Sequence, residues 1–269
     1  MTSIRDPHQD RLFEQLERQL TGWEDPPARL MQALRQNELE LYAQPIFSLR
    51  DAGTIAMAEV LVRMREEERA LLPPGMFLPV FEYCGMMHEL DRWVARQTVA
   101  RLARGSRVRR FTLNISSQTL SDASYLKEIV AELARVRLPA AALAFEISEE
   151  DLIALPASAM EFASAARNLG FSIVLDGFGR RAASLAPLRA LSVNYVKVDG
   201  VIVLGLENSA IARNKLEAVV QISKVVGVEL IGECVETPGA IEHLRKQGVA
   251  YAQGYGMSRP APIDQVAAA

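Results

Sequence analysis

Cysteine and histidine are both scarce in this sequence, which has two cysteines and three histidines among its 269 residues. Cys84 and Cys234 cannot build a disulfide framework, and neither lies in a metal-binding spacing, so we expect two reduced thiols. No pair among the histidines has the spacing of zinc ligands. The sequence therefore argues against a zinc site and against a disulfide-stapled fold.

Long hydrophobic runs are also missing. The longest apolar stretches, such as residues 218–222, are broken by polar residues well short of the length that spans a membrane. No charged segment followed by an apolar stretch opens the sequence, so we expect no membrane span and a cytoplasmic location. A formal net charge of −3 gives no general attraction to DNA. Any phosphate ligand must therefore be held by local cations or by a metal ion.

The remaining composition is that of a globular protein, with 49% hydrophobic and 23% charged residues. Two ordinary domains would fit the length, but no segment rich in proline, glycine or serine divides the chain. A single α/β barrel of about 250 residues fits it as well. We therefore favour one barrel.

Short apolar strands that end in a polar residue recur along the chain. Residues 172–175 form an apolar run that ends in Asp176 and Gly177, and such a run is typical of a strand buried on both faces in a parallel sheet. Residues 111–114, 143–146, 195–199 and 228–233 repeat the pattern, with helices expected between the strands at 88–103, 123–136, 157–168, 184–191, 208–225 and 239–247, and a last strand at 249–253. This alternation predicts a TIM-like (β/α)8 barrel, an α/β fold whose strand ends meet at one mouth.

The beginning of the chain departs from this alternation. Predicted strands at 40–47 and 55–63 are joined by residues 51–54, too few for a crossover helix, so this first pair should be antiparallel. Helical periodicity at 10–20, and an Asp-Pro start to a helix at 25–35, predict an N-terminal helical extension. We expect three parts: a helical extension at 1–36, the barrel at 37–264 and a tail at 265–269.

The strand ends supply hard oxygen donors without histidine or thiolate: Glu59, Asn114, Glu146 and Asp176. Such a set favours Mg²⁺ or Mn²⁺ over zinc or copper. Lys197 follows on the next strand and Glu233 on the one after. A lysine near a metal can hold an attacking water, and a carboxylate opposite can take its proton. The set predicts metal-assisted attack of water on a phosphate ester.

Each of these residues also has a structural interpretation. A polar residue after a strand is often a helix cap or a solvated loop residue. Asn114 precedes Ile115 and Ser116, so the alternative for it is a helix cap, and the alternative for Lys197 is a rim ion pair with Asp199. If each residue served only as a separate helix cap, we would not expect five successive strands all to end in such a residue.

The order of these motifs resembles the EAL domain of bacterial cyclic di-GMP signalling, over residues 37–264. The name-giving tripeptide appears as Glu59-Val60-Leu61, with Gln44-Pro45-Ile46 upstream. Further matches follow in the family's order: Asn114-Ile115-Ser116, Glu146-Ile147-Ser148-Glu149, Asp176-Gly177-Phe178-Gly179, Lys197-Val198-Asp199-Gly200, Glu233-Cys234-Val235-Glu236-Thr237 and Gln253-Gly254-Tyr255.

The resemblance implies a phosphodiesterase that opens cyclic di-GMP to linear pGpG with Mg²⁺ or Mn²⁺, commonly as a dimer, within a signalling pathway that can include a protein partner. It implies that the first metal is held by Glu59, Asn114, Glu146 and Asp176. Asp176 and Glu233 would help to hold a second, with Glu233 also placed as base and Lys197 steering the attacking water. The supporting residues would be Asp199, Glu236, Gln253 and the loop residue Glu149, and the dinucleotide would be held by Gln44, Arg63 and Asp91.

The sequence departs from the family pattern at one strand end. The family has two adjacent aspartates where this chain has Asp176 and Gly177, and residues 180–184 replace a Thr-Gly-aromatic-Ser-Ser loop. Losing one transition-state contact costs on the order of 10²–10³ in rate. Arg180 and Arg181 would add positive charge beside the phosphates or lie in solvent. Three interpretations stay open: hydrolysis, weakened by Gly177; an inactive receptor for cyclic di-GMP; and a barrel that acts through protein contacts alone.

Overall fold

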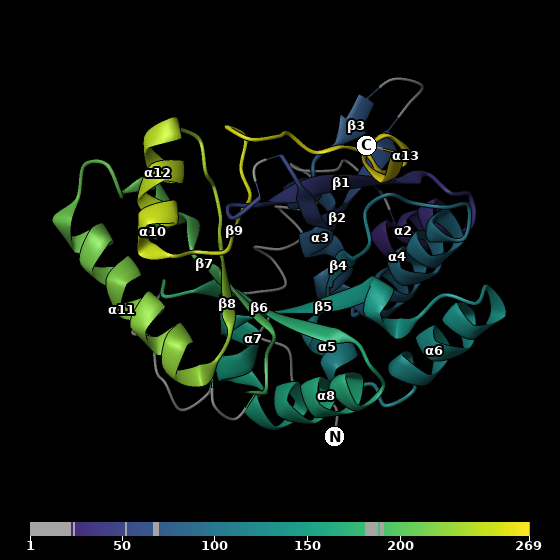
Figure 1. Cartoon of the computed structure of the whole chain (residues 1–269). Coiled ribbons are helices and arrows are strands. Elements are labelled where there is room, and N and C mark those ends of the chain that lie inside the picture. The colour runs from purple at the N-terminus through teal and green to yellow at the C-terminus, as the bar shows by residue number, and fades with distance from the viewer. Residues whose placement is uncertain are drawn as a thin grey trace, which may run out of the picture.

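The computed structural model describes residues 23, 25–51, 53–66, 70–180, 188 and 191–268. Eight of the described strands close into a barrel, with helices packed around it (Figure 1), which confirms the predicted fold class. In ring order the strands are β1 (Leu39–Ser48), β2 (Ile55–Glu66), β4 (Phe111–Asn114), β5 (Leu143–Ser148), β6 (Ser172–Phe178), β7 (Tyr195–Val198), β8 (Glu229–Gly232) and β9 (Tyr251–Ala252).

The first strand runs against the others. β1 pairs antiparallel with β2 on one side, with Gln44 opposite Glu59, and antiparallel with β9 on the other. From β2 to β9 every neighbouring pair in the ring is parallel. The Ser48 hydroxyl accepts hydrogen bonds from the backbone of Arg50 and Asp51, which closes the short turn. The predicted antiparallel start of the barrel is therefore confirmed. Two short strands, β3 (Ala70–Leu72) and β10 (Ala261–Pro262), extend β2 and β1.

Most of the expected helices lie within a few residues of their predicted ends. Helix residues 10–20 and most of 184–191 fall outside the described part of the chain. None of the described helices is both long and apolar enough to cross a bilayer. The helices are α2 (Pro26–Arg35), α3 (Pro74–Tyr83), α4 (Met87–Leu102), α5 (Ser117–Leu120), α6 (Tyr125–Arg135), α7 (Glu149–Ala154), α8 (Pro156–Asn168), α10 (Gly200–Leu204), α11 (Ala210–Val226), α12 (Pro238–Gln247) and α13 (Ile263–Ala268).

The two ends of the described chain pack onto the barrel. Asp25 caps α2 by accepting a hydrogen bond from the Ala28 backbone N–H, and Leu30 and Ala33 are fully buried in the core that surrounds the strands. At the other end α13 buries Val266 and Ala267 in the same core. Packing therefore continues across residues 36 and 264. The division into three parts stays a prediction.

Arg92 ties α4 to the start of α6. Its guanidinium donates to Asp122 and Glu128, and the Arg92 side chain is largely buried. Partial burial opposes ionisation of Asp122, but hydrogen bonds from Arg92 and Ser124 lower its pKa to about 2. Because the folded-state pKa lies below the ordinary value of 3.8, this stabilisation is present above pH ~4 and is lost as the pH falls toward ~2.

We expect Arg92→Gln to lower the free energy of unfolding by about 1–2 kcal/mol at pH 7. The loss should be smaller at pH 3, because that pH lies below the ordinary pKa of 3.8 and Asp122 takes up a proton when the wild type unfolds, which already lowers its stability. Urea denaturation at the two pH values measures both. Arg135→Gln, which removes a surface pair with Glu132 on the same helix, should change stability by less than ~0.5 kcal/mol. An equal loss at both pH values would contradict the assignment to Asp122.

Candidate functional site

The barrel interior is built in two layers. An apolar layer is formed by five strand residues that contact one another: Ile46, Met57, Ala144, Val174 and Ile231. Residues two apart on a strand face the same side. Two positions further along come polar residues, which form the next layer toward the carboxyl ends of the strands: Glu59 after Met57, Glu146 after Ala144, Asp176 after Val174 and Glu233 after Ile231. Strand alternation therefore brings these carboxylates to one rim above an apolar floor.

Lys197 lies at the centre of this rim. Its side chain is only 1% exposed, and its Nζ is 2.6 Å from Glu146 Oε2 and 2.9 Å from Glu59 Oε2. Nζ is also 3.6 Å from Glu233 Oε1 and 3.8 Å from Asp176 Oδ1. Lys197 therefore pairs with carboxylates from four other strands, and the alternative of a rim ion pair with Asp199 is wrong.

The charges of this cluster depend on one another. Burial opposes the charge of Lys197, but the carboxylates around it raise its pKa well above the ordinary value. Burial raises the pKa of Glu146 to about 8 and also raises that of Glu233. Burial acts on Glu59 in the same direction, yet Lys197 and two hydrogen bonds lower the pKa of Glu59 below its ordinary value. Lys197 alone therefore does not balance the whole set, and a further cation would be stabilised there.

The donor atoms fit a hard divalent cation. Glu146 Oε1 and Asp176 Oδ1 are buried and accept no hydrogen bond, and Glu59 Oε1 accepts one from Asn114 Nδ2 at 3.0 Å. All are carboxylate or amide groups of the kind that Mg²⁺ and Mn²⁺ prefer. Within the described ranges no three acidic, histidine or cysteine side chains lie together in metal-binding geometry. The Lys197 ammonium lies among these oxygens. The predicted ligands of such an ion stay Glu59, Asn114, Glu146 and Asp176.

A chain of amides connects the carboxylate rim to β1. Gln253 Nε2 donates to Glu59 Oε2 at 2.8 Å and lies 3.2 Å from Gln44 Oε1. Gln44 Nε2 donates in turn to the Ser258 carbonyl. Gln44, Glu59 and Gln253 line a cavity of about 310 Å³, together with Glu233, Glu236 and Tyr255. The predicted residues Gln44, Gln253 and Glu236 therefore adjoin the rim.

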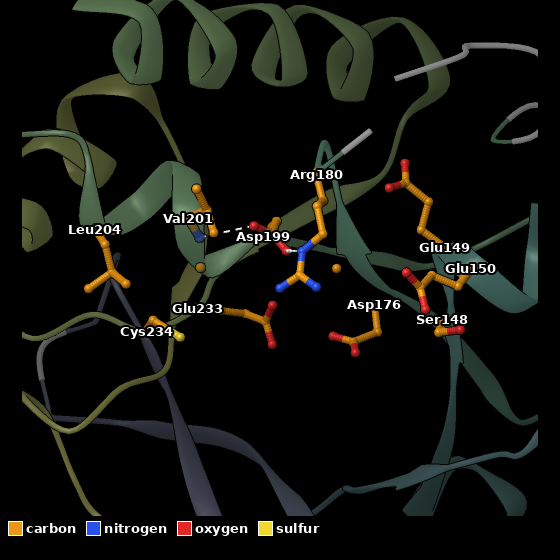
Figure 2. A pocket seen from close by; sticks show the side chains of 12 residues that line it. Ser148, Glu149, Glu150, Asp176, Arg180, Asp199, Val201, Leu204, Glu233 and Cys234 are labelled. Atoms are coloured by element: carbon orange, nitrogen blue, oxygen red, sulfur yellow. Dashed lines mark hydrogen bonds and ion pairs between the residues drawn. The ribbon is translucent and has the colours of Figure 1, made fainter. Parts of the chain in front are cut away.

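A second cavity, of about 420 Å³, lies on the other side of Glu233 and is lined by Asp176, Gly177, Arg180 and Asp199 among others (Figure 2). β6 bulges at this point, since its pairing with β7 shifts between Leu175 and Phe178. Gly177 lies in the bulge with φ +68°, a left-handed conformation that favours glycine. Arg180 Nε is 2.9 Å from Asp199 Oδ2. Asp199 Oδ1 also caps α10 by accepting from the Val201 N–H.

Two other predicted residues, Glu149 and Asp91, are buried and hold loops next to the strand ends. Glu149 is buried and accepts a hydrogen bond from the Gly179 N–H at 3.4 Å, so it contacts the loop after β6. Asp91 is 6% exposed, and its Oδ2 accepts from the Ser116 backbone, the Ser116 hydroxyl and Thr119. Asp91 therefore holds the turn after β4, and a direct contact with a ligand stays a prediction.

Arg63 lies apart from the carboxylate rim. It follows Glu59 by four residues on β2, which places it about 13 Å further along the strand on the same face. Its guanidinium lies over the Tyr42 ring, 5.5 Å from the ring centre.

Ser116, and not Asn114, caps α5, so the helix-cap alternative for Asn114 is wrong.

Sequence patterns gave no signal for one feature of the site. Cys234 follows Glu233 with φ +51°, a left-handed conformation that is uncommon for cysteine. Its side chain lines both cavities and packs against Gly200, where an added Cβ would lie 2.5 Å from Cys234 Sγ. This close packing therefore requires glycine at position 200.

A model of the EAL domain family matches residues 28–260 of this chain. PdeB of Shewanella oneidensis, named a cyclic di-GMP phosphodiesterase, is 32% identical over 262 residues, which cover 95% of this chain and 31% of that protein. NbdA of Pseudomonas aeruginosa, named likewise, is 33% identical over 238 residues, which cover 87% of this chain and 30% of that protein. This chain spans about a third of the length of these relatives.

A solved structure with a similar fold is described with a bound ligand. The FimX EAL domain of Pseudomonas aeruginosa, described as bound to c-di-GMP, matches with a TM-score of 0.82 and 28% sequence identity. The match covers 88% of this chain and 96% of that one.

Proposed function

This chain belongs to the EAL domain family, as its motifs predict, and from this premise we propose that it hydrolyses cyclic di-GMP to linear pGpG with Mg²⁺ or Mn²⁺. Relatives named as cyclic di-GMP phosphodiesterases and a similar structure described as bound to that dinucleotide support the proposal. The observation that carries hydrolysis, as distinct from binding alone, is the position of Lys197 among four carboxylates at the rim.

The reaction joins water to one phosphodiester of the ring. The water oxygen forms a bond to phosphorus, the bond from phosphorus to the 3′ oxygen breaks, and that oxygen takes a proton from solvent. A divalent cation, when bound, supplies positive charge to the phosphate as the bonds change. Glu233 accepts a proton from the water, and Lys197 orients that water through Nζ. The product keeps a 5′ phosphate and a free 3′ hydroxyl, which is linear pGpG.

The remaining polar residues would hold the dinucleotide and the cluster. Arg63 suits a phosphate because a guanidinium can donate to two oxygens at once. Gln44 and Gln253 present amide groups beside Glu59. Asp91 would act through the turn after β4, which it already fixes by three hydrogen bonds. Self-association and a protein partner stay predictions.

The second candidate is a receptor that binds cyclic di-GMP without turnover. Gly177 favours it, because the family's second aspartate is missing there and glycine supplies no ligand in its place. Both candidates share the same ligand and the same residues. They differ in whether pGpG accumulates.

A turnover assay separates the two candidates. We expect the purified protein with Mg²⁺ or Mn²⁺ to convert cyclic di-GMP to pGpG, resolved by liquid chromatography, and EDTA to stop the reaction. Calorimetry at tens of micromolar protein measures binding in parallel. Binding heat without product over a wide range of Mn²⁺ would select the receptor. The absence of both binding heat and product would contradict both candidates.

A further inference from the structure

The missing carboxylate at residue 177 and the arginine at residue 180 concern the same point in the active-site cavity. A Cβ placed on Gly177 would have Asp199 Oδ2 as its nearest neighbouring atom, at 4.0 Å. Arg180 Nε lies 2.9 Å from that same oxygen. A cation shared by a carboxylate at 177 and by Asp199 would therefore lie in the region that the Arg180 guanidinium now occupies.

We propose that Arg180 replaces the second metal ion, so that this chain holds a single divalent cation and uses the guanidinium as the other positive charge at the phosphate. The inference rests on the proposed function for its substrate, a cyclic dinucleotide phosphodiester. The Arg180 side chain neither gives up a proton nor forms a covalent bond. It contacts non-bridging oxygens while the bond from phosphorus to the 3′ oxygen breaks.

The direction of the side chain supports this role. Figure 2 shows the Arg180 guanidinium pointing into the cavity between Asp176 and Glu233. Asp199 is 4% exposed and the Arg180 side chain is 63% exposed. The buried carboxylate therefore anchors Nε, while the rest of the guanidinium faces the cavity. A guanidinium anchored at one edge can still donate to phosphate oxygens from the other.

The charges around the cavity also favour a cation at this point, in addition to the Lys197 ammonium beside Asp176 and Glu233. Arg180 is the one basic residue among the described side chains that line it, and Asp176, Asp199 and Glu233 are among the acidic ones. A phosphodiester approaching this wall meets strong repulsion unless positive charge lies between. In two-metal sites the second ion supplies that charge, and an arginine can supply it in phosphoryl transfer.

The conformation of Gly177 permits a direct exchange between the two arrangements. Its φ of +68° is tolerated by aspartate better than by most residues, and no atom lies closer than 4.0 Å to the added Cβ. Gly177→Asp alone would place a carboxylate beside the Arg180 guanidinium and form an ion pair. Gly177→Asp combined with Arg180→Thr would leave that carboxylate free to hold a metal ion with Asp199.

The decisive measurement is the number of Mn²⁺ ions bound per chain, by equilibrium dialysis without nucleotide and again with pGpG present. We expect one ion for the wild type, one for Gly177→Asp and two for the double variant. Arg135→Thr, a surface arginine with similar exposure, is the matched control and should bind one. Two ions in the wild type, or no gain in the double variant, would overturn the proposal.

Turnover gives an independent readout. Arg180→Thr should lower kcat by 10²–10³-fold, the usual effect of losing one transition-state contact, whereas Arg180→Lys should keep part of the activity. The double variant should regain activity and show a steeper dependence on Mn²⁺ concentration than the wild type. If no variant makes pGpG, the proposed hydrolysis fails while the Mn²⁺ counts still decide the role of Arg180. Full activity of Arg180→Thr with one bound ion would overturn the role of Arg180 and leave hydrolysis intact.

Discussion

Replacing Glu59 with glutamine is expected to lower the turnover of cyclic di-GMP by at least 10²–10³-fold. Glu59 is the best-connected carboxylate of the rim, because it accepts hydrogen bonds from Lys197, Asn114 and Gln253. Glutamine keeps the size of the side chain and removes the charge that would hold a divalent cation. It also presents an N–H to at least one donor where Glu59 presents an acceptor. Chromatography of pGpG at saturating Mn²⁺ measures the loss.

The matched control is Glu242→Gln, which changes a half-exposed glutamate on α12. It should keep wild-type activity, because its ion pairs within the described part of the chain are with Arg245 and Lys246 on the same helix. Circular dichroism verifies that both variants keep their helix content. Activity of Glu59→Gln within tenfold of the wild type would remove Glu59 from the proposed metal site.

The position of the rim carboxylates followed from the sequence because strand alternation leaves little freedom. Val174 and Asp176 must share the inward face of β6, and Ala144 and Glu146 must share that of β5, once the strands are parallel and buried. The parallel ladders then bring the strand ends together at one mouth. Residues more than a hundred positions apart, such as Glu59 and Lys197, could thus be predicted as neighbours.

The partner of Lys197 was harder to predict. Asp199 lies two positions after Lys197, yet it follows the end of β7 and caps α10. Lys197 is held by the hydrogen bonds of β7, whereas the Asp199 side chain is held by its bond to the start of α10. Their closeness in sequence therefore does not decide whether the two side chains contact each other. Helices of four to six residues, such as α5, α7 and α10, were missed because so few residues carry no measurable periodicity.

The burial of Asp91 could have been recognised from its spacing. Asp91, Ala95 and Thr98 lie at intervals of four and three on α4, and all three are buried. They form part of the apolar stripe that a helix turns toward the core. An acidic residue on that stripe must find hydrogen-bond donors, which Ser116 and Thr119 supply. The resemblance to a ligand-binding position obscured this structural role.

The loss of the second aspartate was visible in the sequence, but its possible compensation was not. Gly177 and Arg180 are three residues apart, and nothing in that spacing indicates that both face Asp199 Oδ2. β6 bulges between Leu175 and Phe178 and ends at Phe178, two residues before Arg180. Strand alternation therefore does not fix the direction of the Arg180 side chain relative to residue 177. A local irregularity therefore decides how the departure from the family pattern acts on the site.

Replacing Lys197 with methionine is expected to lower the free energy of unfolding by about 3–5 kcal/mol in buffer containing EDTA, because it leaves buried carboxylates without their cation. For a chain of this size that corresponds to a fall in Tm of roughly 6–20 °C. Methionine keeps an unbranched side chain of similar length, so little packing is lost. Lys246→Met, an exposed lysine on α12, should change stability by less than ~0.5 kcal/mol.

Added Mn²⁺ should then distinguish two roles of Lys197, its charge among the carboxylates and its contact with the attacking water. A divalent cation that binds the folded state raises Tm by mass action, and we expect a larger rise in Lys197→Met than in the wild type, because the variant's carboxylates have no competing ammonium. Turnover should stay 10²–10³-fold low even in saturating Mn²⁺, since an ion can replace the charge of Lys197 but not its contact with the attacking water. Recovery of both stability and turnover by Mn²⁺ would reduce Lys197 to a counterion, and the case for hydrolysis would then depend on Glu233 alone.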